Sequence, residues 1–355
     1  MSTPREVTER WERERLASGA ALAAASRGRL TPEPDDELRT SFQRDRDRVI
    51  HSKAFRRLKH KTQVFLAPEG DHYRTRLTHT IEVAQVARTA ARALRFNEDL
   101  TEAIALAHDL GHPPFGHAGE AALDAVMAPI GGFRHVEQSL RVVEVLERRT
   151  RADGTQVRGL NLTWEVRDGI GLHSKGLSDL EAEAPDDALP ATLEGRLVRL
   201  ADRIAYVHHD ADDAMRAGLI AEAEVPAGVR EVLGRTRGQW LDVMVRDLVR
   251  TTGRTGTVTL SDEVRVALNA LKDFLAERVY QGPASAPEVA KAQRLLRALY
   301  TYHLEHPEEL SDEYRDLIEE GEPLPRVVGD FLAGMTDRYA IRLAETLFVP
   351  GRWAI

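Results

Sequence analysis

The chain has 355 residues, of which 42% are hydrophobic and 30% are charged, so it is long enough for one large globular domain or two ordinary ones. Its formal net charge of −8 argues against a protein dominated by nucleic-acid binding, and no apolar run approaches the ~20 residues that span a bilayer, so no membrane partner is expected. Because cysteine is absent, disulfides, thiolate catalysis and cysteine-ligated metals are excluded, which fits a cytoplasmic protein.

Helical spacing of alanine, leucine, arginine and glutamate recurs along the chain, which predicts an all-α protein. The expected parts are an N-terminal arm over residues 1–38, a core over residues 39–220, and a helical C-terminal part over residues 221–355 packed on the core. One helix or a pair of helices is expected over residues 40–65, and single helices are expected over residues 78–94, 98–109, 136–149, 164–172 and 193–217. A further helix is expected to begin near Gly119. Loops are expected over residues 151–159, 180–190, 251–256 and 282–287. The two strand candidates are residues 161–164 and 255–260.

The helical stretch expected over residues 40–65 is strongly basic. It carries eight cationic side chains, which are Arg44, Arg46, Arg48, Lys53, Arg56, Arg57, Lys59 and Lys61. In an acidic protein such a local run indicates a polyanionic ligand, and single-stranded DNA is one partner that fits. The alternatives are a solvated helix face or an oligomer interface.

The next helix, over residues 78–94, carries the first candidate ligand. Thr78 is its expected N-cap, and Ile81 is expected among its inward-facing residues. His79 lies at its start, and Arg76 precedes His79 by three residues. Arginine is the side chain of choice for multidentate phosphate binding, so Arg76 is a candidate phosphate ligand.

The densest group of candidate site residues comes after the helix over residues 98–109. Three histidines and two carboxylates fall between His108 and Glu120, interrupted by glycines and prolines. Imidazoles and carboxylates are common metal ligands and proton shuttles. With His79 upstream and Asp202 downstream, the pair His108-Asp109 indicates a metal site of the pattern His…His-Asp…Asp.

The apolar surroundings of Asp202 support this interpretation, because a carboxylate that faces a core needs a positively charged partner. Two imidazoles and two carboxylates suit manganese, magnesium, iron, nickel, cobalt or zinc, and ligand type alone does not choose between these divalent ions. The alternative is that His79 and His108 are ordinary helix-end histidines and that Asp202 pairs with an arginine.

Two further groups have helical spacing. His117 and Glu120 are three residues apart, so they share a helix face, and a carboxylate that orients an imidazole is typical of general acid–base catalysis. The alternative for Glu120 is a helix cap. Asp202, Tyr206 and Asp210 follow at intervals of four residues along one face, where Tyr206 could contact a ligand and Asp210 a sugar hydroxyl. The alternative is a core tyrosine and a helix-end charge.

These residues resemble the HD-domain phosphohydrolases, whose signature His…His-Asp…Asp would be met by His79, His108-Asp109 and Asp202. The resemblance extends to the bacterial deoxyguanosinetriphosphate triphosphohydrolase-like proteins over roughly residues 4–350. Besides residues 108–117, the segments that carry it are FQRDRDR (42–48), AFRRL (54–58), KTQVF (61–65), GGF (131–133), LEG (193–195) and ADRIAY (201–206). One departure is Arg134-His135-Val136 after the GGF segment, where many relatives have Glu-His-Asn.

The resemblance implies an HD-domain catalytic core with additional C-terminal helices. It also implies metal-dependent hydrolysis of dGTP or another dNTP to deoxynucleoside and triphosphate, by water attack on the α-phosphorus. Carried over by position, the divalent metal would be held by His79, His108, Asp109 and Asp202, and His117, oriented by Glu120, would be the catalytic histidine. The substrate ligands would be Arg76 and His112 near the α-phosphorus, Gln63 at the sugar or base edge, His135 toward the phosphate chain, and Tyr206 and Asp210 at the sugar.

The resemblance further implies a homo-oligomer, a hexamer or a tetramer, and some members of the family are activated by a dNTP. Two other functions compete with dNTP hydrolysis. One is an HD phosphohydrolase that acts on a nucleoside monophosphate or on guanosine tetraphosphate, although a monophosphate has little use for the positive charge near Arg76. The other is a regulator that binds nucleotide or single-stranded DNA through a degenerate HD site, against which the presence of all four ligands weighs.

Overall fold

The computed structural model describes residues 2–63, 74–151, 153–174, 180, 189–280 and 286–350. Within these residues the fold consists of sixteen α-helices and one two-stranded sheet, so the predicted all-α class is confirmed. None of the helices in this part of the chain combines the length and the apolar character that crossing a membrane requires.

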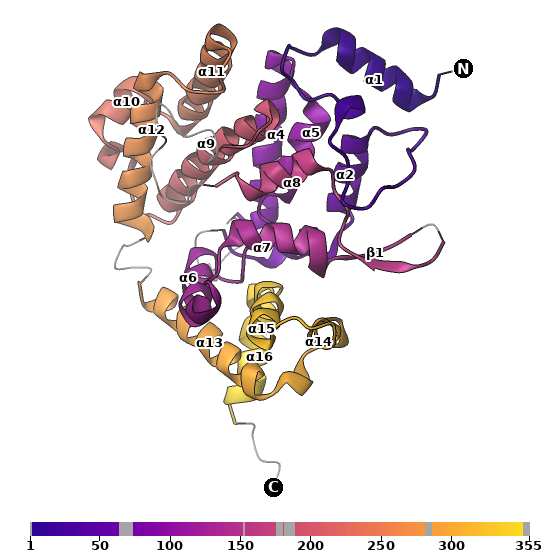
Figure 1. Cartoon of the computed structure of the whole chain (residues 1–355). Coiled ribbons are helices and arrows are strands. Elements are labelled where there is room, and N and C mark those ends of the chain that lie inside the picture. The colour runs from indigo at the N-terminus through magenta and orange to yellow at the C-terminus, as the bar shows by residue number, and fades with distance from the viewer. Residues whose placement is uncertain are drawn as a thin grey trace.

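The centre of the molecule is a group of helices that share one apolar core (Figure 1). They are α2 (Ser41–Ile50), α4 (Arg76–Leu94), α5 (Glu98–Ala107), α8 (Trp164–Gly171) and α9 (Leu193–Arg216). α4 presents small residues to its neighbours, among them the fully buried Ala87 and Ala90, so α5 and α9 can approach it closely. This packing brings the start of α4 and the end of α5 beside the middle of α9.

Two further groups of helices pack against this centre. α10 (Ala227–Leu233), α11 (Arg237–Thr255) and α12 (Asp262–Leu275) share an apolar cluster with α9. At the lower end of Figure 1, α6 packs with the last four helices. This lower group consists of α6 (Gly116–Met127), α13 (Ala286–Glu305), α14 (Asp312–Glu319), α15 (Leu324–Ala333) and α16 (Asp337–Phe348). The domain boundaries after residues 38 and 220 stay predictions.

The remaining helices are α1 (Pro4–Arg15), α3 (Lys53–Arg57) and α7 (His135–Arg141). The helix predicted over residues 136–149 is too long, because α7 passes into a wider π-helical turn and the chain then extends into a strand. This strand, β1 (Arg148–Thr150), pairs antiparallel with β2 (Gln156–Arg158) where a loop was expected. The strand candidates at residues 161–164 and 255–260 are wrong, since neither forms a strand.

Helix ends also differ from their prediction. α4 begins earlier than expected, because its N-cap is Thr75, whose hydroxyl accepts a 3.5 Å hydrogen bond from the backbone nitrogen of Thr78. Ile81 is 52% exposed and does not face inward. α11 runs through most of the loop predicted over residues 251–256, until Gly256 ends it with a positive φ of 74°. The loops predicted over residues 180–190 and 282–287 lie largely outside the described residues.

Asp45 on α2 joins three segments of the chain from a fully buried position. Its carboxylate forms an ion pair with Arg29, in the segment between α1 and α2. It also accepts hydrogen bonds from the backbone nitrogen of Thr163 at 2.8 Å and from the Thr163 hydroxyl at 2.6 Å, just before α8. A buried charge is tolerated only while such partners are present.

Replacing Asp45 by alanine should lower the free energy of unfolding by about 3–5 kcal/mol, because the Arg29 guanidinium would stay buried without its carboxylate. The matched control is Asp47→Ala on the same helix. The Asp47 carboxylate is partly exposed, pairs with Arg39 and Arg46, and should contribute about 1 kcal/mol or less. Urea denaturation followed by circular dichroism measures both variants, and equal losses of stability would contradict the role of Asp45.

Candidate metal centre and active site

Four side chains from three helices converge at the centre of the fold. His79 lies in the first turn of α4, His108 and Asp109 directly follow α5, and Asp202 lies midway along α9. His79 Nε2 is 3.2 Å from Asp202 Oδ1. His108 Nε2 is 3.6 Å from that oxygen and 3.4 Å from Asp109 Oδ1. The structure therefore brings the four predicted metal ligands around one point.

The donor atoms of this group fit a divalent metal. His108 Nδ1 lies 2.7 Å from the carbonyl oxygen of Ala105, so Nδ1 is the nitrogen that donates and the Nε2 edge of the ring faces the carboxylates. Nε2 is buried and has no hydrogen-bond partner among the described residues, a need that a metal ion would meet. His79, His108 and Asp109 offer ligand atoms that all lie within 4.8 Å of one another. These ligands do not fix which divalent ion is bound.

The electrostatics of the centre favour a cation. Burial lowers the pKa of His108, but Asp109 and Asp202 outweigh burial and raise that pKa to about 9. For Asp202, burial acts in the opposite direction, yet His108 and His79 hold its pKa well below the usual value. The same holds for Asp109, whose neighbours are two imidazoles and the Arg76 guanidinium. Both carboxylates are therefore ionised at neutral pH.

Arg76 contacts one of these carboxylates directly. Its side chain is buried, and its Nη1 donates a 2.7 Å hydrogen bond to Asp109 Oδ2, which fixes the orientation of that carboxylate. Because a guanidinium carries five N–H groups, Arg76 can hold Asp109 and still donate to a phosphate oxygen. Its Nε has no partner among the described residues.

The centre opens into a cavity of about 360 Å³, which is large enough for a nucleotide-sized ligand. Ten of the twelve predicted site residues line this cavity. They are Gln63, Arg76, His79, Asp109, His112, His117, Glu120, His135, Asp202 and Tyr206. The other two, His108 and Asp210, are fully buried and do not line it.

Glu120 on α6 lies closer to His135 than to its predicted partner His117. Its Oε1 accepts 2.8 Å hydrogen bonds from the backbone nitrogen and from Nδ1 of His135, whereas its Oε2 is 3.8 Å from His117 Nδ1. The His135 ring stacks on His112 with a centroid distance of 3.9 Å. Burial opposes ionisation, but the nearby His117 imidazole and the hydrogen-bonded His135 hold the pKa of Glu120 well below its usual value. Glu120 is thus an ionised carboxylate among three imidazoles.

Tyr206 and Asp210 share a face of α9, as their spacing predicts, but only Tyr206 reaches the cavity. Its ring centroid is 6.4 Å from that of His117. Asp210 is fully buried and accepts a hydrogen bond from the hydroxyl of Tyr280. Burial raises the pKa of Asp210 to about 8. The structure therefore does not bring Asp210 to the cavity wall, and its contact with the sugar stays a prediction.

His173, which follows α8, belongs to the centre although no sequence pattern indicated it. It is buried and lines the cavity, with Nε2 4.0 Å from Asp109 Oδ1. Burial, assisted by the charges of His108 and His135, lowers the pKa of His173 to about 3, so its ring is neutral. Its position depends on the packing of α8 against α5 and α9, which no local spacing rule predicts.

Three arginines of the cavity wall were also missed. They are Arg134, Arg199 and Arg203. Arg203 directly follows Asp202, and Arg199 lies one helical turn before it, so helical periodicity around Asp202 was a signal that could have indicated both. Together with Arg76, these side chains place four guanidinium groups on a wall that also carries the carboxylates of Asp109, Glu120 and Asp202.

Part of the basic run over residues 40–65 is paired with carboxylates within the molecule. Arg44 and Arg48 pair with Glu33, and Arg46 pairs with Asp99 at 2.9 Å. These three arginines therefore form internal ion pairs, which reduces the charge that this helix offers to a polyanion. Binding of single-stranded DNA by the run stays a prediction.

Known proteins resemble the chain over nearly its whole length. It matches the HD domain family over residues 76–207 and the phosphohydrolase-associated domain family over residues 258–346. A protein of Caldanaerobacter subterraneus subsp. tengcongensis is 49% identical over 350 residues, which cover 98% of this chain and 97% of that protein. Proteins of Desulfatibacillum aliphaticivorans and Clostridium tetani are 46% and 41% identical, covering 98% of this chain and 99% and 96% of their own lengths. All three are named deoxyguanosinetriphosphate triphosphohydrolase-like protein.

Proposed function

The chain belongs to the deoxyguanosinetriphosphate triphosphohydrolase-like family of HD-domain proteins, and from this premise we propose that it hydrolyses a deoxynucleoside triphosphate to deoxynucleoside and intact triphosphate. The HD domain and the His/Asp cluster make it a metal-dependent phosphohydrolase. The proposal adds the substrate, which is dGTP or another dNTP, and the bond that is cut, which joins the α-phosphorus to the 5′-oxygen.

The observation that carries the proposal is the number of arginines beside the candidate metal ligands. Arg76, Arg134, Arg199 and Arg203 line the same cavity as His79, Asp109 and Asp202. Arginine binds phosphate oxygens through several donors at once, and a triphosphate spreads its charge over three phosphate groups. A nucleoside monophosphate offers too few oxygens to engage this set.

A divalent ion such as manganese or magnesium, held by His79, His108, Asp109 and Asp202, would supply Lewis acidity and activate water for in-line attack on the α-phosphorus. Arg76 and His112 would bind the non-bridging oxygens of the α-phosphate, where negative charge increases in the transition state. His117 would donate a proton to the departing 5′-oxygen, which is otherwise a poor leaving group. Glu120 would orient His135 toward the phosphate chain and His117 toward the leaving group.

The deoxynucleoside would be recognised at the other side of the cavity. Gln63 is 6% exposed, and its Oε1 has no hydrogen-bond partner among the described residues. A hydroxyl of the sugar or an amino group of the base would satisfy that oxygen. The Tyr206 ring would lie against the sugar, where the missing 2′-hydroxyl leaves room for an aromatic side chain. Asp210 would contact the same sugar.

The product of the reaction tests the proposal. Purified protein with manganese or magnesium should release triphosphate and deoxynucleoside from at least one dNTP. Ion-exchange chromatography separates triphosphate from pyrophosphate and monophosphate. Pyrophosphate and a deoxynucleoside monophosphate as products would contradict the proposed cut. Hydrolysis of a nucleoside monophosphate or guanosine tetraphosphate in place of every dNTP would favour another HD phosphohydrolase.

The four dNTPs should be assayed singly and as a mixture, because we propose that the protein acts as a homo-oligomer, a hexamer or a tetramer, that a second dNTP can activate. Activity that appears only in the mixture would identify such an activator. Single-stranded DNA, the other proposed partner, should bind with an affinity that falls steeply as salt increases. Binding of nucleotide or DNA without any hydrolysis would instead favour a regulator with an HD fold.

A further inference from the structure

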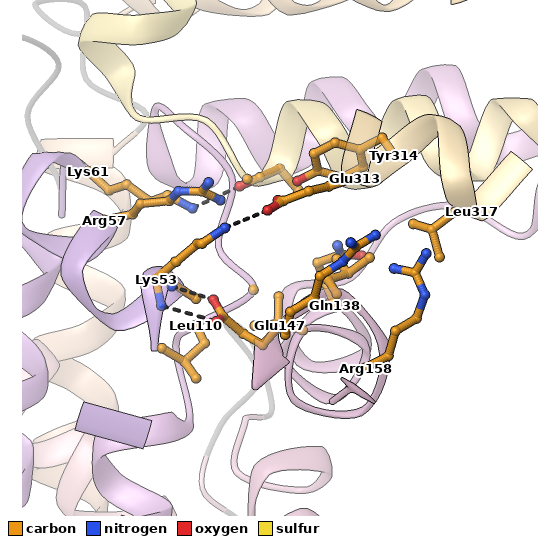
Figure 2. Close-up of a pocket in the computed structure, with 17 residues that line it drawn as sticks. Lys53, Arg57, Lys61, Leu110, Gln138, Glu147, Arg158, Glu313, Tyr314 and Leu317 are labelled. Atoms are coloured by element: carbon orange, nitrogen blue, oxygen red, sulfur yellow. Dashed lines mark hydrogen bonds and ion pairs between the residues drawn. The ribbon is translucent and has the colours of Figure 1, made fainter. Parts of the chain in front are cut away.

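A second, smaller cavity of about 40 Å³ is lined by Leu110 and Gly111, which directly follow Asp109, and by residues of α14 and the end of α15 (Figure 2). Its wall is formed by α3, by Leu110 and Gly111 directly after the metal ligands, by the strands β1 and β2, and by the end of α15. The cavity has room for a group of a few heavy atoms, such as one phosphate, and is too small to enclose a nucleoside. All of the residues that line it are described by the structure.

The wall of this cavity carries more cations than carboxylates although the protein as a whole is acidic, and one of these cations, Lys53, pairs with Glu313. Two of its side chains are carboxylates, Glu147 and Glu313, against five cations, which are Lys53, Arg57, Lys61, Arg148 and Arg158. Glu147 is held by the backbone nitrogens of Lys53 and Ala54 at the start of α3. The cavity therefore retains an excess of positive charge, which favours an anion.

Arg57 is the cation with the fewest partners. Among the described residues no carboxylate forms an ion pair with it, and its guanidinium lies near the hydroxyl of Tyr314, where it opposes the rise that burial causes in the pKa of that hydroxyl. In contrast, Arg148 pairs with Asp316 at 2.6 Å and Arg158 with Glu320 at 2.9 Å. Figure 2 shows Arg57 beside Lys61 on one side of the cavity and Arg158 on the other. Arg57 is thus positioned to bind an anion that enters between them.

Lys61 connects this cavity to the active site. It is 3% exposed, and its Nζ donates to the carbonyl oxygens of His112 at 2.5 Å and of Ala333 at 2.8 Å. No carboxylate of the described chain forms an ion pair with Lys61. Burial, followed by the charges of Arg57 and Arg76, lowers the pKa of Lys61 to about 7. A bound anion would stabilise the ammonium form of this lysine, and with it the hydrogen bond from Nζ to the His112 carbonyl oxygen.

The part of the cavity wall next to the metal ligands is held in place by hydrogen bonds. The Gly111 backbone nitrogen donates to the Ser139 hydroxyl at 2.9 Å, and that hydroxyl donates to the carbonyl oxygen of His108 at 2.7 Å. A Cβ atom at Gly111 would lie 2.1 Å from the Ser139 backbone nitrogen, so this close approach requires glycine. A ligand in the cavity would therefore contact a segment that is tied to the metal centre.

We propose that this cavity is a binding site for a single phosphate group, held by Arg57 and Lys61 with Arg158 opposite, and distinct from the substrate cavity. The ligand is either free orthophosphate or the terminal phosphate of a larger molecule whose remainder lies outside the cavity. Binding does not depend on the proposed dNTP hydrolysis, so the site can exist whether or not that activity is found.

The test compares two adjacent arginines of α3 in the full-length protein. Arg57→Gln removes the guanidinium that faces the cavity, whereas the matched control Arg56→Gln removes an exposed guanidinium that contacts the His51 carbonyl oxygen. Orthophosphate is titrated at constant ionic strength, and the rise in Tm is measured. The wild type and Arg56→Gln should bind alike, and Arg57→Gln should bind about 10- to 100-fold more weakly, the effect of losing one charged hydrogen-bond donor. Equal titrations for both variants would overturn the proposal.

Two further arms complete the test. The titration is repeated with AMP: a response that is sensitive to Arg57 with AMP indicates the phosphate of a larger molecule, and a response with orthophosphate alone indicates the free ion. Wild-type crystals soaked in tungstate, a tetrahedral oxyanion with a strong anomalous signal, give an answer that does not depend on the folding of a variant. Tungstate beside Arg57 is the expected result, and tungstate in the substrate cavity alone would contradict the proposal.

Discussion

Asp202→Ala is expected to abolish metal-dependent hydrolysis and to remove the divalent ion from the protein. Asp202 Oδ1 lies between the two imidazoles, 3.2 Å from His79 Nε2 and 3.6 Å from His108 Nε2, so its loss removes the ligand that both histidines face. Substituting a side chain that only supports a metal ligand typically costs 10–100-fold in affinity or activity, so removing a ligand itself should cost more than about 100-fold.

Isothermal titration with manganese measures the effect on metal affinity, and the product assay measures the effect on activity. The matched control is Asp242→Ala on α11, which removes a carboxylate that is 58% exposed and pairs with Arg246 on the surface. The control should bind manganese and turn over substrate as the wild type does. Manganese affinity that is unchanged in Asp202→Ala would contradict the ligand set.

His117→Ala is expected to lower kcat by about 10²–10⁴-fold, because the 5′-oxygen would leave without a general acid. The fold should be unaffected, since the His117 side chain is 53% exposed and its nearest acidic partner, Glu120, is 3.8 Å away. KM should change little, because the arginines and the metal ligands that would hold the triphosphate remain. Steady-state kinetics with the dNTP that is hydrolysed fastest measures both constants.

The control for this variant is His306→Ala, which removes another exposed imidazole, on the segment after α13. If kcat of His117→Ala equals that of the wild type, His117 has no part in the reaction. Proton donation would then fall to His135, the imidazole that Glu120 contacts at 2.8 Å. Comparing His117→Ala with His135→Ala therefore assigns the proton donor within this cluster.

The metal ligands could be predicted because the signals that indicate them lie in short stretches of the sequence. His108 and Asp109 stand where α5 must end before Gly111 and Pro113, so both side chains turn toward one point, and Asp202 lies on an otherwise apolar helix face. A polar group in such a place needs a partner wherever the helix packs. Periodicity also predicted α4, α5 and α9, whose packing brings these residues together.

The proton-transfer cluster could be predicted only in part. The interval of three residues places His117 and Glu120 on one face of α6, but it says nothing about His135, which reaches Glu120 from the start of α7. The burial of Lys61 could not be predicted from the sequence either. Its ammonium group contacts the carbonyl oxygen of Ala333 on α15, so its environment is decided by a helix far along the chain, whereas the sequence places it at the end of a basic run.

The central claim is that one divalent ion binds between α4, α5 and α9. Anomalous diffraction from crystals soaked in manganese tests it most directly. A single anomalous peak in contact with His79, His108, Asp109 and Asp202, at ligand distances of about 2.0–2.3 Å, is the expected result. Full-occupancy manganese elsewhere in the crystal, with these four side chains unligated, would contradict the account.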